Sequence, residues 1–361
     1  MSGPLRLLKN PWTRGVLVVG MLVAVLLALW WQGPDWRIVY HAFDFVAWRW
    51  VVTGVLLNLL SVLARTLSWR LTISQALPSP QPTFGQVFSS FGIGLLGNAV
   101  LPARAGELAR VAVLRRHLPR HGSGTIATLL GTVFAHRLFD LFPVSLLVVY
   151  VLLTAKIPHW AVTSLVVVFL IGVTLLATGI LSARRARGGS HALDSGVSSL
   201  RRLLVMARQG LAVLRAPLWA AAAIFFQLVG WFLQLLAVWA VMEAFGMDTP
   251  LPAAGLVLLL MNVATIFPLW PGNIGLLQAA VALPLVQYGV AYGTGFAYAL
   301  VLQAIEMSVG VGVGLVFLAR EGLSLASLQR MEGERESEED AIVAREAARV
   351  EDVERESAAA L

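Results

Sequence analysis

The hydrophobic positions of this chain fall into nine apolar segments, and the polar positions gather in the stretches between them. The segments cover residues 15–31, 45–64, 84–101, 124–155, 160–183, 217–243, 253–267, 272–288 and 294–319. About 20 apolar residues are enough to cross the hydrocarbon core of a bilayer as a helix. The pattern therefore predicts an all-α, polytopic membrane protein.

The basic residues between the segments predict which side of the membrane each loop faces. Eighteen lysines and arginines lie on one side, among them Arg65 and Arg70 after the second segment, whereas the opposite loops hold only three. Loops rich in Lys and Arg stay cytoplasmic. We therefore expect a multi-pass protein of the cell (inner or plasma) membrane with cytoplasmic N- and C-termini.

Two regions do not fit simple crossings. Segment 84–101 lies between two basic, cytoplasmic regions, and segments 253–267 and 272–288 lie between two poorly charged, external loops. Each region should enter the membrane and return on the same side, which predicts about six full spans plus two re-entrant helical hairpins. The hairpins would enter from opposite sides as an inverted repeat with halves at about 84–155 and 251–319.

Weak sequence similarity between the two halves agrees with such a repeat. Each half has a proline followed four residues later by a glycine, and an ionisable residue inside its next span. The matching residues are Pro102, Gly106 and Arg137 in one half, and Pro268, Gly272 and Glu306 in the other. Inverted repeats in transporters hold the substrate near the midplane, between broken helices.

The stretch LPARAGELAR (101–110) concentrates charge beside apolar sequence. A helix that opens near Glu107 would attract anions through its free N–H groups and its dipole. Glu107 and Arg110 are three residues apart and can pair, which leaves Arg104 as the less committed cation. The pattern is typical of a phosphate cradle. The alternative is a cytoplasmic loop with ordinary positive-inside arginines.

A second charged group, His136, Arg137 and Asp140, lies well inside an apolar segment. Asp140 shares a helix face with both basic residues. A charge at this depth costs at least about 2.5 kcal/mol on insertion scales, so it indicates a functional site by default. The alternative is an Arg–Asp pair that locks helices together. We also expect this group to face Arg104 or Glu107 across the hairpin.

Residues that break helices or offer neutral hydrogen bonds are candidates for shaping and gating the hairpins. They are Pro102, Gly106, Pro268, Pro271, Gly272, Asn273, Gly275 and Gln278. His136 and Glu306 are candidates for coupling transport to protons. In the second half, a structural role in helix packing is an equal alternative.

Composition limits the function further. The 361 residues are 58% hydrophobic and 13% charged, with a mean hydropathy of +0.78 and no cysteine, which excludes disulfides and thiol chemistry. No catalytic or metal-binding motif is present, so we expect neither an enzyme nor a cofactor. The arginines are scattered among apolar spans, which argues against nucleic acid as a partner.

Charge is divided unevenly along the chain. Residues 1–320 hold 22 Lys and Arg against 8 Asp and Glu, whereas residues 321–361 hold 5 against 12. We expect a transmembrane domain over 1–320 and a poorly ordered acidic tail over 321–361. Within the linker 184–215, an apolar stripe predicts an amphipathic helix on the anionic membrane surface, with a solvated connector as the alternative.

Three motifs together resemble the lysylphosphatidylglycerol synthase transmembrane-region, or flippase-like, family over most of residues 15–320. They are GNAVLPARAGELAR (97–110), HRLFD (136–140) and PLWPGNIGLLQ (268–278). The resemblance implies a helical protein that handles phospholipid or polyprenyl-linked lipid head groups. It carries the family's motif positions onto Arg104, Glu107, Arg110, Arg137 and Asp140.

These observations predict a protein that translocates a membrane lipid with an anionic head group, which would bind at the five charged residues just named. Two alternatives stay open. One is a non-transporting scaffold or partner of a lipid-modifying enzyme or glycosyltransferase, and the other is an importer of a small organic anion. The sequence does not predict the oligomeric state.

Overall fold

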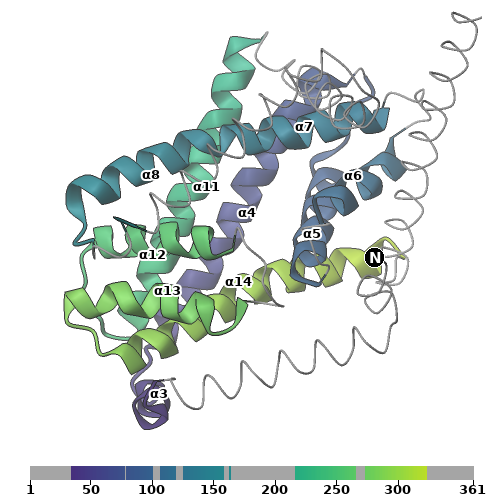
Figure 1. The fold of residues 1–361 in the computed structure, drawn as a ribbon. Helices are drawn as coiled ribbons and strands as arrows, with labels where there is room; N and C mark the ends of the chain where they lie inside the picture. The colour runs from purple at the N-terminus through teal and green to yellow at the C-terminus, as the bar shows by residue number, and fades with distance from the viewer. Residues whose placement is uncertain are drawn as a thin grey trace, which may run out of the picture.

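The computed structural model describes residues 34–77, 79–100, 106–118, 125–157, 162–163, 216–265 and 273–322. Every regular element in these ranges is helical, as the sequence predicts (Figure 1). The elements are α3 (Trp36–Ala42), α4 (Trp48–Ala76), α5 (Phe84–Val100), α6 (Gly106–His117), α7 (Thr125–Phe139), α8 (Leu141–Thr154), α11 (Pro217–Ala244), α12 (Leu251–Ala264), α13 (Leu276–Leu285), the short 3-10 helix η5 (Val286–Tyr288) and α14 (Tyr292–Arg320).

Four helices of the described residues are long and apolar enough to cross a membrane. They are α4, the almost continuous helix Thr128–Thr154 formed by α7 and α8, α11 and α14. They correspond to four of the six spans expected from the sequence. The other two expected spans, 15–31 and 160–183, lie outside the described residues, as do the linker 184–215 and the tail beyond residue 322.

Helices α5 and α6 form an antiparallel hairpin, and α6 begins at Gly106, beside Glu107, where the sequence predicts that a helix opens. Their backbones cross closely, because a Cβ atom on Gly97 would lie only 2.7 Å from the Cα atom of Gly106. The charges of α6 hide this helix from a hydropathy search. It is buried by packing against α5 rather than by an apolar sequence of its own.

Helices α12 and α13 pack against each other. Asn273 adopts a positive φ of 46° and donates from its side chain to the Ala264 carbonyl over 2.8 Å. Gly275 has a φ of 91°, a conformation that favours glycine, and caps α13. The sequence predicts a helix break here, and these two residues form its described part.

Helices α4 and α11 run antiparallel through the middle of the molecule and make its most extensive helix pair (Figure 1). The Ala47 amide, before α4, donates to the Ala244 carbonyl at the end of α11 over 2.8 Å. On either side of this pair, α5 packs against α14, and α12 packs against α8. Each of these contacts joins a short helix of one half to a long helix of the other.

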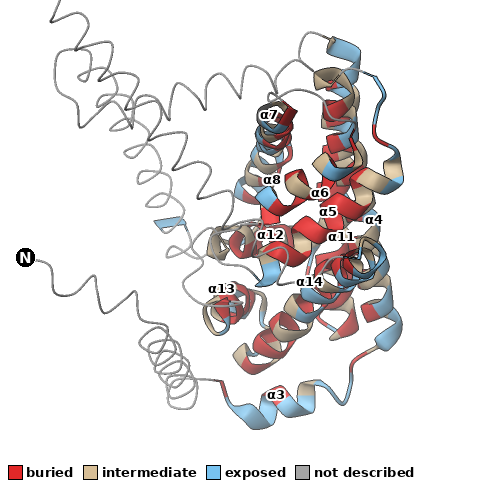
Figure 2. Ribbon diagram, turned by 90° about the vertical axis from the view of Figure 1, so that its right-hand side faces the viewer, coloured by how far each residue is buried: buried red, intermediate tan, exposed pale blue. Residues whose placement is uncertain are grey.

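Buried residues line the inner faces of these helices, whereas α3 is largely exposed (Figure 2). The largest apolar core joins α4, α8, α11, α12, α13 and α14, and a second one joins α4, α5, α6, α7 and α14. Large apolar side chains also cover outward faces of the long helices, for example Leu146, Leu153, Phe225, Phe232 and Val316. Exposed apolar faces of this kind suit contact with lipid.

Candidate functional site

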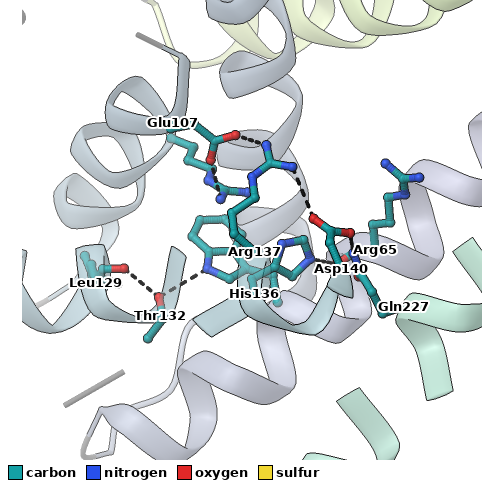
Figure 3. Close-up of polar contacts among 10 residues, drawn as sticks. Arg65, Glu107, Leu129, Thr132, His136, Arg137, Asp140 and Gln227 are labelled. Carbon is teal, nitrogen blue, oxygen red and sulfur yellow. Dashed lines mark hydrogen bonds and ion pairs between the residues drawn. The ribbon is translucent and has the colours of Figure 1, made fainter. Parts of the chain in front are cut away.

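Glu107 joins the hairpin to the span formed by α7 and α8. It is the second residue of α6, and its Oε2 atom lies 2.5 Å from Nη2 of Arg110, one turn later. Its Oε1 atom pairs with Nη2 of Arg137 on α7 (Figure 3). One carboxylate therefore pairs with two arginines that are far apart in the sequence.

Arg110 is the buried member of this group, with a side chain only 4% exposed. Its guanidinium carbon lies 4.7 Å from the ring centroid of Trp69 and 5.5 Å from that of Phe91. Aromatic faces of this kind attract cations.

Trp69 is itself held in place, which fixes the surface beneath Arg110. Its indole N–H donates to the hydroxyl of Thr132 over 3.2 Å, and this hydroxyl donates to the Leu129 carbonyl over 2.7 Å. Helix α4 thus supplies the ring and α7 orients it.

Asp140 lies at the junction of α7 and α8 and extends the cluster towards α11. Its Oδ2 atom is 3.3 Å from Nη1 of Arg137. Its Oδ1 atom accepts from the indole N–H of Trp231 over 2.8 Å and from the side-chain amide of Gln227 (Figure 3). Sequence reasoning missed both α11 residues, although their spacing of four places them on one face of a helix.

Arg137 is the open member of the cluster. Its side chain is 47% exposed, whereas those of Glu107 and Asp140 are 19% and 14% exposed. A ligand can therefore reach this guanidinium, while the two carboxylates hold it from behind.

His136 points away from this ion-pair chain and towards α4. It is buried, and its Nε2 atom lies 3.2 Å from the Arg65 carbonyl oxygen. Because a carbonyl oxygen only accepts, Nε2 carries the proton. A coupling role for His136 stays a prediction.

Arg65 is a further residue of the site. The sequence predicts that it follows the second span, but α4 continues to Ala76, so Arg65 lies inside a membrane-length helix. Its Nη2 atom donates to the side-chain carbonyl of Gln234, and its guanidinium carbon is 5.1 Å from the Trp231 ring centroid. The hydropathy pattern ends at residue 64 because polar residues follow, and three of them, Thr66, Ser68 and Thr72, are buried.

Gln234 connects Arg65 to the second half of the chain. Its side-chain N–H donates to Oε1 of Glu306 on α14 over 3.1 Å. Glu306 thus lies beside a neutral amide rather than beside the arginines of the first cluster. Its proposed coupling role is untested.

The remaining candidates of the second half have local structural contacts. Gln278 is fully buried; its oxygen accepts from the Gly275 amide over 2.6 Å, and its nitrogen donates to Gln303 over 2.5 Å. It therefore caps α13 and ties it to α14. Five other candidates, Pro102, Arg104, Pro268, Pro271 and Gly272, lie outside the described residues.

Comparison with known proteins identifies the domain that carries these contacts. A family profile described as the lysylphosphatidylglycerol synthase TM region matches residues 15–314. The chain belongs to this family. No curated protein and no solved structure gives a match.

The family match includes every residue of both polar groups, from Arg65 to Glu306. This member of the lysylphosphatidylglycerol synthase transmembrane-region family is a multi-pass membrane protein, and four helices of its described residues are long and apolar enough to cross a membrane. Among the residues that the structure describes, no group of three His, Asp or Glu side chains is arranged to hold a metal ion.

Proposed function

We propose that this protein moves a phospholipid or a polyprenyl-linked lipid with an anionic head group from one leaflet to the other. The observation that carries the proposal is the cluster of Arg65, Arg110, Arg137, Glu107 and Asp140 among membrane-length helices. This cluster holds three positively charged and two negatively charged side chains. Charge in such a position is costly unless it serves a ligand or pathway, and membership of a flippase-like membrane family agrees with this reading.

The arrangement of the cluster suits transient binding of a phosphate. Arg137 is open to a ligand, and guanidinium groups bind phosphate through two parallel hydrogen bonds. Glu107 and Asp140 orient Arg137 and limit the excess positive charge. A phosphate would therefore be attracted without being held too tightly to leave. Arg104 stays a predicted contact of the phosphate, and the acyl chains would stay in the bilayer.

We also propose that the two hairpins belong to an inverted repeat that opens the site to alternate sides. The contacts support this idea. If α4, α5, α6 and α7–α8 correspond to α11, α12, α13 and α14, then the packing of α5 on α14 matches the packing of α12 on α8. The antiparallel pair of α4 and α11 is what an inverted repeat requires.

The proposal is tested by reconstituting the pure protein in vesicles with fluorescent phospholipids that a membrane-impermeant reductant bleaches only in the outer leaflet. Wild-type protein should let the reductant bleach inner-leaflet anionic lipid as that lipid crosses. Arg137→Ala should slow this at least about tenfold, because it removes charge-assisted hydrogen bonds. Arg70→Ala is the matched control, because Arg70 is exposed on α4.

The same vesicles distinguish the alternatives. Uptake of a soluble organic anion without lipid movement would favour an importer. No lipid movement, together with a cellular phenotype that Arg137→Ala leaves intact, would refute translocation and favour a scaffold for a lipid-modifying enzyme.

Membrane orientation can be mapped directly, because the chain has no cysteine to interfere with single-cysteine labelling. We propose that the N- and C-termini face the cytoplasm. Cysteines at 245–250 and at 290 should then react from outside, and cysteines at 115–120 from inside. Reaction of position 290 from inside would refute the inverted repeat.

A further inference from the structure

We propose that Arg65 and Gln234 form a second anion site, which receives the lipid phosphate from Arg137 at the boundary between the two halves. This inference rests on the proposed function and names a residue pair for it.

Arg65 differs from the other two arginines in its distance from acids, because Asp140 and Glu306 act on its charge only from beyond ion-pairing distance. Arg110 and Arg137 each pair with a carboxylate, whereas no ion pair within the described residues involves Arg65. Its Nη2 atom donates to the neutral amide of Gln234, and its buried Nε atom has no hydrogen-bond partner among these residues. A buried guanidinium N–H without a hydrogen-bond partner is costly, and an anionic ligand would supply the missing acceptor.

The space for this side chain is built into α11. A Cβ atom on Gly230 would lie 2.8 Å from Cγ of Arg65, so glycine at this position leaves room for the arginine stem. The next residue, Trp231, places its ring against the guanidinium, and Gln234 lies one turn further along. Gly230, Trp231 and Gln234 of α11 therefore together position the Arg65 side chain.

The location of Arg65 links the two charged groups of the molecule. Trp231 contacts Arg65 with its ring and donates its N–H to Asp140 of the first cluster. Gln234 accepts from Arg65 and donates to Glu306 of the second half. A phosphate that leaves the exposed Arg137 would thus meet Arg65 next. The Nε–H group of Arg65, which has no hydrogen-bond partner among the described residues, would then donate to a phosphate oxygen. Guanidinium donors match phosphate oxygens in geometry and charge.

The position of Arg65 and Gln234 also suits the transfer of a phosphate between the two halves of the protein. Both lie on the central α4–α11 pair, which the two halves share. Gln234 is neutral, so it can orient Arg65 without cancelling its charge. Glu306 lies behind the amide and would repel an anion that moves too far, which favours release.

The test measures binding rather than transport. The full chain, purified in a neutral detergent, is titrated with short-chain phosphatidylglycerol, and binding is followed by the increase in melting temperature. Arg65→Ala should weaken the apparent affinity at least about tenfold, since it removes charge-assisted hydrogen bonds. Arg65→Lys keeps the charge but loses the planar donor pair, so its affinity should be intermediate. Arg70→Ala should bind like the wild type.

The outcomes separate this site from the proposed function. Unchanged binding by both Arg65 variants would overturn the site, even if vesicle assays show translocation. Binding that depends on Arg65 in a protein that moves no lipid would support the site and refute translocation. Titration with glycerol 3-phosphate identifies the ligand source: an Arg65-dependent response to this soluble ester would support the anion site while excluding the lipid tails as a requirement. If Arg65→Ala does not fold, Arg65→Lys alone decides.

Discussion

The crossing of α5 and α14 allows a sharp test, because two glycines of α14 lie two residues apart in opposite surroundings. A Cβ atom on Gly314 would collide with the Cβ atom of Leu96 and lie 2.8 Å from the Gly92 carbonyl oxygen. A Cβ atom on Gly312 would meet nothing within 4 Å. The same substitution, glycine to alanine, therefore probes a tight helix contact and an open face of one helix.

The expected magnitudes follow from this geometry. Alanine favours a helix over glycine by about 1 kcal/mol, and this gain is shared by both substitutions. Overpacking a close contact costs about 1–3 kcal/mol. Because the propensity gain cancels in the comparison, Gly314→Ala should be less stable than Gly312→Ala by about 1–3 kcal/mol. Gly312→Ala itself should match or exceed the wild type in its free energy of unfolding.

The assay is equilibrium unfolding in mixed micelles of a neutral and a denaturing detergent, followed by circular dichroism of the helices. Both variants are compared with the wild type at the same protein concentration. Equal free energies of unfolding for Gly312→Ala and Gly314→Ala would refute the close contact of α5 with α14. The position of the whole hairpin beside the charged cluster would then be wrong, since α5 positions α6 and therefore Glu107.

Three further substitutions test the contacts of the cluster. Glu107→Gln leaves buried Arg110 without a carboxylate and should cost about 3–5 kcal/mol in free energy of unfolding, measured in the same micelles; a loss below the experimental error would argue against the ion pair. Asp140→Asn keeps the shape of the side chain but weakens its contact with Arg137. Because Arg137 is half exposed, the loss of free energy of unfolding should be smaller than for Glu107→Gln. Lipid translocation in vesicles should nevertheless drop at least about tenfold. Trp69→Phe keeps a ring beneath Arg110 but removes the hydrogen bond to the Thr132 hydroxyl on α7, which should lower the free energy of unfolding by about 0.5–1.5 kcal/mol. A double-mutant cycle with Thr132→Val should give an interaction energy of this size, and additive losses would show that the bond is absent.

Comparison of prediction and structure shows where local sequence is informative. Long apolar segments predict α4, α7–α8, α11 and α14, because the insertion of a segment into the membrane depends mainly on its own hydropathy. Helix α6 escapes the same reasoning. Its charged residues exclude it from a hydropathy search, and its helix is stabilised by close packing on α5.

The candidate site divides in the same way. The spacing of Glu107 with Arg110, and of Arg137 with Asp140, follows from helix periodicity, so these pairs could be predicted from sequence. The contact between Glu107 and Arg137 depends on how α6 meets α7. The positions of Arg65 and of its partners on α11 depend on the antiparallel crossing of α4 and α11.

The sequence by itself determined the class of the protein, its long described helices and the pairing of Glu107 with Arg110 and of Arg137 with Asp140. These features depend on hydropathy and helix periodicity, both of which act over short distances along the chain. Only the tertiary structure decided which arginines form ion pairs with carboxylates and which one binds a neutral amide instead. That outcome depends on which side chains the helix crossings bring within hydrogen-bonding distance, and residues 65, 107, 137, 234 and 306 meet through contacts that no local pattern records.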